Sequence, residues 1–113
     1  MKGSVTVTEQ ALAAVVGLAA HEVPGVVGMS PVGIRDGLSR ILGRNEASEG
    51  VVVKADPARP GTYQADVYVV VAFGVNIPAV VELIAERARW AAKHLAGLEL
   101  ERVFVHVVGV SRG

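Results

Sequence analysis

The spacing of apolar residues along the chain predicts two long helices. Between residues 8 and 22, and again between 77 and 96, apolar residues recur every three or four positions, as in a helix packed on one side. Thr6 or Thr8 can cap the first helix, and Pro24-Gly25 ends it. The first apolar stripe contains Leu12, Val15, Val16, Ala19 and Val23. The second contains Ile77, Val80, Val81, Ile84, Ala88, Ala91, Ala92 and Leu95.

Valine-rich runs predict the strands, at residues 4–7, 26–29, 51–55, 63–73 and 100–108. In the run 63–73 every second residue should face the core, which predicts buried side chains at Tyr63, Ala65, Val67, Val69, Val71 and Phe73. Gly74 then allows a turn, and Asn76 can cap the second helix. These two residues therefore have structural roles, as turn and cap.

A single α+β domain covering residues 1–113 follows from this order of elements. The strand–helix–strand unit between 63 and 108 predicts a parallel crossover within a small mixed β-sheet, with the two long helices packed on one face. The opposite face of the sheet would carry an apolar surface of the kind that marks an interface. Alternatively, residues 30–49 fold across it, with a short helix between 33 and 43. This outer face comprises Val52, Lys54, Tyr68, Val70, Phe104, His106 and Val108.

The charge and composition of the chain argue against several classes of function. Lys plus Arg and Asp plus Glu both number 11, so there is no basic surplus for a nucleic-acid surface. There are no cysteines, and the three histidines are scattered without an acidic cluster, so we predict no metal and no cofactor. The longest apolar runs are too short to span a bilayer, which predicts a cytoplasmic protein without direct membrane insertion. Four acidic residues that could serve as general acids are interpreted as solvated charges: Asp56, Asp66, Glu82 and Glu86.

Four segments, taken in order, resemble the alkaline shock protein family of Gram-positive bacteria. They are Val5-Thr6-Val7-Thr8, Glu22-Val23-Pro24-Gly25-Val26, the strand and turn from Val69 to Ile77, and the closing strand from Val103 to Val110. Phe73 stands where the family usually has Tyr, and His106 where a small polar residue is usual. The resemblance implies a non-enzymatic role in envelope stress response or homeostasis. It also implies protein–protein contacts, through self-association or a membrane-anchored partner that holds the protein near the membrane.

Tyr68, Phe104 and His106 are the candidate contact residues on the outer face. The alternative hypothesis is a small RNA-binding module of KH-like type. It would use the Gly-x-x-Gly segment 25–28 together with Arg35, Arg40 and Arg44. The two valines inside that segment instead favour a buried turn. A small-ligand or enzyme subunit would need a polar pocket, which the sequence does not reveal.

Overall fold

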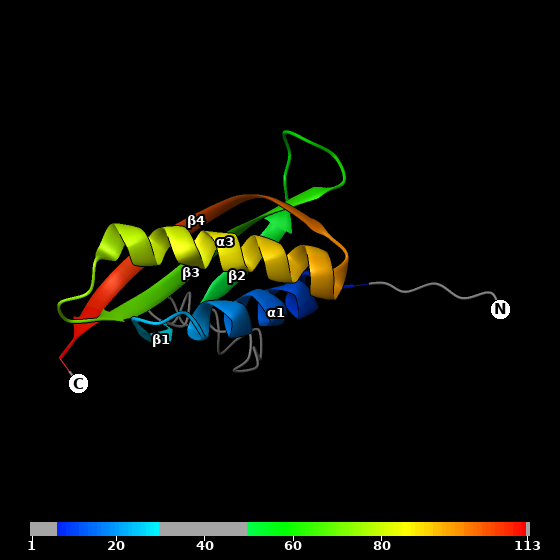
Figure 1. Ribbon diagram of the computed structural model, residues 1–113. Coiled ribbons are helices and arrows are strands. Elements are labelled where there is room, and N and C mark those ends of the chain that lie inside the picture. The colour runs from blue at the N-terminus through cyan, green and yellow to red at the C-terminus, as the bar shows by residue number, and fades with distance from the viewer. Residues whose placement is uncertain (1–6, 30–49, 113) are drawn as a thin grey trace, which may run out of the picture.

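The computed structural model describes residues 7–29 and 50–112, and it has the α+β architecture expected from the sequence (Figure 1). Its helices are α1 (Glu9–His21) and α3 (Ile77–Ala96). Its strands are β1 (Val26–Met29), β2 (Val51–Ala55), β3 (Thr62–Ala72) and β4 (Glu99–Ser111). The strand expected at 4–7, the short helix expected between 33 and 43, and Arg35, Arg40 and Arg44 lie wholly or largely outside the described residues.

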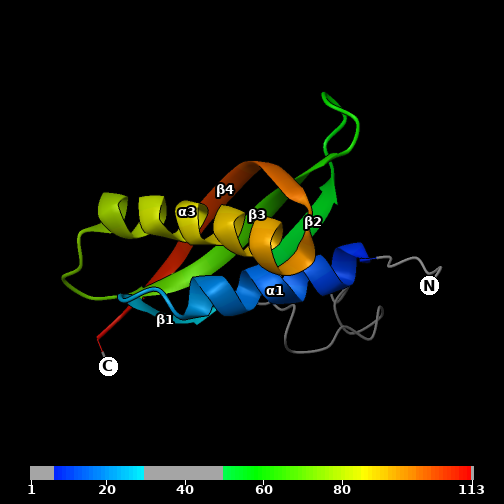
Figure 2. The same ribbon diagram turned by 45° about the vertical axis from the view of Figure 1, so that its right-hand side comes forward.

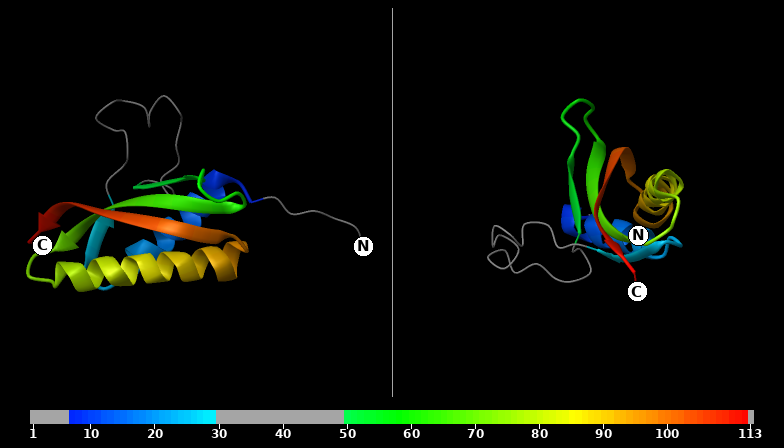
Figure 3. Two further views of the ribbon diagram at one scale, coloured as in Figure 1. Left: turned by 90° about the horizontal axis from the view of Figure 1, so that it is seen from above. Right: turned by 90° about the vertical axis from the view of Figure 1, so that its left-hand side faces the viewer.

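The long strand β3 is the centre of a mixed sheet. β4 runs parallel to it along its whole length, as the crossover predicts. β1 and β2 are antiparallel to β3 and pair with its last and first halves, respectively. Because β4 occupies one edge of β3 completely, β1 and β2 must share the other edge, one after the other. Figure 3 shows β2 and β4 on opposite sides of β3.

The core lies between the sheet and the two helices, which cover the same face (Figure 2). Alternate residues of β3 point to one side of a strand, so a single face carries the four fully buried side chains Ala65, Val67, Val69 and Val71. The helices contribute Leu12, Val16 and Ala20 from α1, and Ile84, Ala88 and Ala92 from α3. Mostly small side chains fill this layer, which lets helix and sheet backbones approach closely.

Local signals fix the ends of the helices. Of the two threonines considered, Thr8 is the N-cap of α1, and its Oγ1 accepts a hydrogen bond of 3.0 Å from the backbone N–H of Ala11. Asn76 caps α3 in the same way, since its side chain accepts a 3.0 Å bond from Ala79 N–H. Gly97 ends α3 in the left-handed conformation with φ 71°. Gly74 turns the chain between β3 and α3 with φ 92°.

Three residues expected in the core are instead exposed. Phe73 lies just past the end of β3 and is 62% exposed, with the guanidinium of Arg112 4.5 Å from its ring centroid. Ile77 and Leu95 are in the first and last turns of α3 and are 38% and 67% exposed. The helical spacing of apolar residues continues into these turns, but the side chains of Ile77 and Leu95 do not join the core cluster. The prediction that these three side chains are buried is therefore wrong.

Candidate functional site

The three candidate contact residues lie together on the sheet face opposite the helices. The parallel register places Tyr68 of β3 beside His106 of β4, and Asp66 beside Phe104. The rings of Tyr68 and His106 are stacked, with centroids 4.4 Å apart and planes 16° from parallel. Residues two apart on a strand share a face, so Asp66 and Tyr68 present their side chains to the same side as Phe104 and His106.

Asp66 holds the imidazole of His106 in place. Its Oδ1 lies 2.8 Å from Nε2 of His106, and because an ionised carboxylate can only accept, the ring N–H donates this hydrogen bond. The two side chains are 22% and 41% exposed. Asp66 is thus a half-buried partner of a histidine and not the solvated charge expected from the sequence. No feature of the linear sequence connects these two residues, since the link requires the β3–β4 register.

Around this cluster the outer face changes from polar to apolar along the strands. At one end Lys54 and Gln64 are register partners, and Gln64 is also opposite Arg102. Towards the other end lie Phe104, which is 42% exposed, and Val108, which is exposed where the β4 register skips a residue. The face therefore offers an aromatic and aliphatic area beside a fixed imidazole.

Asp56 lies in the turn between β2 and β3, and the sequence pattern does not indicate that its side chain is buried. It is only 3% exposed, so its interpretation as a solvated charge is wrong. Its Oδ1 accepts a 3.0 Å bond from the N–H of Ala58 and thereby closes the turn between β2 and β3. Its Oδ2 forms an ion pair at 3.2 Å with Nε of Arg102, with geometry short of a hydrogen bond. The carboxylate ties this turn to β4.

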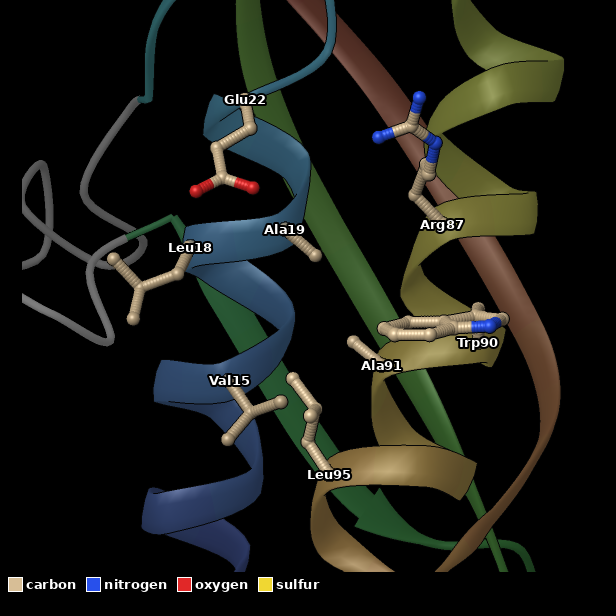
Figure 4. A pocket seen from close by; sticks show the side chains of 8 residues that line it. All are labelled: Val15, Leu18, Ala19, Glu22, Arg87, Trp90, Ala91 and Leu95. Carbon is tan, nitrogen blue, oxygen red and sulfur yellow. The ribbon is translucent and has the colours of Figure 1, made fainter.

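A second surface lies on the opposite side of the molecule, where α1 and α3 run side by side (Figure 4). A groove of about 250 Å³ opens between them. Leu18, Trp90 and Leu95 project at its walls and are 61%, 55% and 67% exposed. Glu22 and Arg87 stand across from each other at one end (Figure 4). The groove is lined by Val15, Leu18, Ala19, Glu22, Arg87, Trp90, Ala91 and Leu95.

The spacing of apolar residues does not identify this groove. Trp90 is the available signal, because it is a large apolar residue lying outside the core stripe of an otherwise amphipathic helix. The same spacing assigns Leu95 to the core stripe itself. The spacing shows which side of a helix is apolar, but it does not show which of those apolar residues the neighbouring helix covers.

Only Gly25 of the Gly25–Gly28 segment lies in a turn, and the rest of the segment belongs to β1, so the buried turn expected here is mostly strand. Gly25 has φ 102°, Val26 is buried and Val27 is exposed. Within residues 7–29 and 50–112, no three His, Cys, Asp or Glu side chains gather as a metal ion would require. In the same ranges, neither helix is long and apolar enough to cross a membrane.

Comparison with known proteins agrees with the resemblance seen in the four sequence segments. The model of the alkaline shock protein 23 family, described as having a cell envelope-related function, matches residues 1–112. The uncharacterised protein Spy1614 of Streptococcus pyogenes is 34% identical over 109 residues, covering 96% of this chain and 88% of the relative. The uncharacterised proteins YloU and YqhY of Bacillus subtilis are 29% and 32% identical, over 96% of this chain and 88% and 77% of theirs. No solved structure matches the chain. On the family match and these relatives, the chain belongs to the alkaline shock protein 23 family, whose function is related to the cell envelope.

Proposed function

We propose that this protein is a non-enzymatic interaction protein of the cell envelope, and that it docks a protein partner on the outer face of its sheet. The observation that carries the proposal is the cluster of Tyr68, His106 and Phe104, organised by the 2.8 Å contact between His106 and Asp66. The family's envelope-related function supports the setting.

The chemistry of this cluster suits a protein partner. Aromatic side chains on rigid strands are typical anchors of protein interfaces, because they bury much area with few rotatable bonds. The ring of His106 is held by a hydrogen bond on its edge and by the stacked Tyr68 on its face. Docking would therefore immobilise little that is not already ordered, which lowers the entropic cost of binding.

The partner we propose is a membrane-anchored protein of the envelope. The protein itself would remain in the cytoplasm and be brought close to the membrane by that partner. An anchored protein needs to present only a short segment with apolar groups for Phe104 and Val108 and an acceptor or donor for Tyr68. The edge of the sheet at β4 lies beside this cluster, so such a segment could extend along it.

Affinity capture from native cells tests the proposal. The tagged protein and its Tyr68→Asp/Phe104→Asp variant are used on separate soluble and membrane fractions. We expect a specific membrane protein to be recovered by the wild type and lost by the variant, because a charge at either ring disrupts an apolar contact. Phe73→Asp is the matched control, since Phe73 is an exposed aromatic residue outside this cluster.

Two outcomes would contradict the proposal. Recovery of the same membrane protein by the double variant would show that the outer face is not the contact. Recovery of RNA instead, with retention that falls steeply as salt rises, would favour the KH-like alternative and the Gly25–Gly28 segment. Circular dichroism of each variant verifies that a loss of binding is not a loss of folding.

A further inference from the structure

We infer that the groove between α1 and α3 is a self-docking surface through which two copies of this chain pair about a two-fold axis. This surface is on the helix side of the molecule, away from the sheet face of the proposed partner contact. The inference therefore goes beyond the proposed function and does not depend on it.

The first reason is the amount of apolar surface left open. Leu18, Trp90 and Leu95 are each more than half exposed, yet they lie around one groove. None of them covers the core of its own chain, as Ile84 or Leu12 does. Large apolar side chains gathered in one place are more typical of an interface than of a solvated helix face.

The second reason is the order of groups along the groove. Figure 4 shows three levels: Glu22 across from Arg87, then Ala19 across from Trp90 and Ala91, then Val15 across from Leu95. Leu18 is level with Ala19 and projects from the outer side of α1. At every level α1 and α3 carry complementary groups, which are acid and base at the first level and apolar at the other two. The two helices also run in opposite directions (Figure 1).

A two-fold axis running along the groove pairs these levels with one another. Rotation about it places α1 of the second copy over α3 of the first, level with level. Glu22 of each copy then meets Arg87 of the other, Leu18 meets Trp90, and Val15 meets Leu95. The facing helices are antiparallel, so the pair forms a four-helix layer, in which antiparallel neighbours are common. The contact is isologous, as two-fold interfaces must be.

The charges of Glu22 and Arg87 favour this two-fold axis over one that runs across the helices. Turning the second copy about an axis across the helices would bring Glu22 over the Val15 end and bury a carboxylate against apolar groups. Within the described part of the chain, neither Glu22 nor Arg87 has an ion pair. The groove therefore supplies both charges of two intermolecular ion pairs, and a second copy of this chain satisfies both.

The area of the groove surface indicates how tightly two copies should bind. At ordinary helix rise and width, the paired helices offer a face roughly 20–30 Å long and about 20 Å wide, so about 500 Å² per copy. Two such faces bury about 1,000 Å² in total, which is at the lower end for specific interfaces. We therefore expect a reversible dimer that dissociates on dilution through the micromolar range.

Sedimentation equilibrium of the full chain tests this arrangement through a charge swap. We expect Glu22→Arg alone and Arg87→Glu alone to weaken dimerisation about tenfold or more, because each places like charges together. The double variant Glu22→Arg/Arg87→Glu should return to within about threefold of wild type, since opposite charges meet again. Trp90→Asp should leave only monomer at concentrations where the wild type is dimeric.

Two controls separate the groove from other surfaces. Glu82→Arg reverses an exposed charge of α3 outside the groove and should leave dimerisation unchanged. The sheet-face variant Tyr68→Asp/Phe104→Asp should also dimerise normally, so failure of this inference and failure of the proposed function give different results. A wild type that stays monomeric throughout, or a dimer unaffected by Trp90→Asp, would overturn the inference. Weakening by both single reversals without recovery in the double variant would overturn the two-fold pairing.

Discussion

Nε2 of His106 lies 2.8 Å from Oδ1 of Asp66, although 40 positions separate the two residues in the chain. The register pairs His106 with Tyr68 and not with Asp66, so the histidine reaches diagonally to the carboxylate while its ring stacks on its direct neighbour. Asp66 and Tyr68, which are neighbours on one face of β3, thus both restrain the side chain of His106 on β4.

This contact should add little to stability, because both side chains are partly open to water. A double-mutant cycle with Asp66→Asn and His106→Gln measures it by urea unfolding. We expect a coupling free energy of about 0.5 kcal/mol, as for other exposed pairs. A value well above about 2 kcal/mol would contradict this and show that the pair is part of the stabilising framework.

The ion pair of Asp56 with Arg102 should contribute much more than that of Glu101 with Arg59. The Asp56 side chain is fully buried, whereas Arg59 and Glu101 are both accessible. Arg102→Met leaves a buried carboxylate without its cation, so we expect a loss of about 2 kcal/mol or more in the free energy of unfolding. Arg59→Met is the matched control and should cost less than about 1 kcal/mol. Equal losses in the two variants would show that burial of Asp56 does not matter.

Substitutions at two glycines with positive φ should differ in severity. An added Cβ at Gly74 meets no atom within 4 Å, so Gly74→Ala stores only backbone strain of about 1–2 kcal/mol. At Gly25 the added Cβ would also lie 3.1 Å from Cγ2 of Val80, which makes Gly25→Ala the more destabilising change. Urea unfolding of the two variants ranks them, and a smaller loss at Gly25 would contradict this order.

We further expect Gly74→Val to lower the melting temperature without altering partner capture, because Gly74 belongs to neither candidate surface. Thermal unfolding and the affinity capture described above check this together. A Gly74→Val protein as stable as the wild type would be inconsistent with the strain that φ 92° implies.

Ile84 and Leu95 belong to the same apolar stripe in the sequence, but their truncation should have unequal effects. Ile84 is fully buried among core residues, so Ile84→Ala should cost about 3 kcal/mol. Leu95 is 67% exposed, and Leu95→Ala should cost less than about 1 kcal/mol. Urea unfolding at low protein concentration isolates the monomer. A large loss from Leu95→Ala under that condition would place Leu95 in the core after all.

Local chemistry explains why the sequence predicts the second helix well. Asn76 and Gly97 signal its start and end within a few residues, and its observed bounds agree with the prediction. The alternation of Ala65, Val67, Val69 and Val71 is equally informative, because a strand has only two faces. The parallel pairing of β3 and β4 follows from the helix between them, since a strand needs a crossover to pair in parallel.

Features that depend on distant neighbours could not be predicted in this way. The burial of Asp56 involves Arg102 on another strand, and the exposure of Leu95 depends on which side of α3 the neighbouring α1 leaves uncovered. Phe73 continues the alternation of β3 but lies one residue beyond its end. Leu95 and Phe73 both continue the periodic pattern of apolar residues, but no neighbouring element within the described residues packs over their side chains, which remain exposed.

The pairing of β4 along all of β3 also constrains how the chain can fold. The β2–β3 hairpin forms from neighbouring residues, but the other edge of β3 stays open until the 20 residues of α3 have been made and β4 follows. An open edge on a valine-rich strand can pair with another chain and start aggregation. Docking of β4 covers this edge, and conditions that delay it should reduce the soluble yield of the protein.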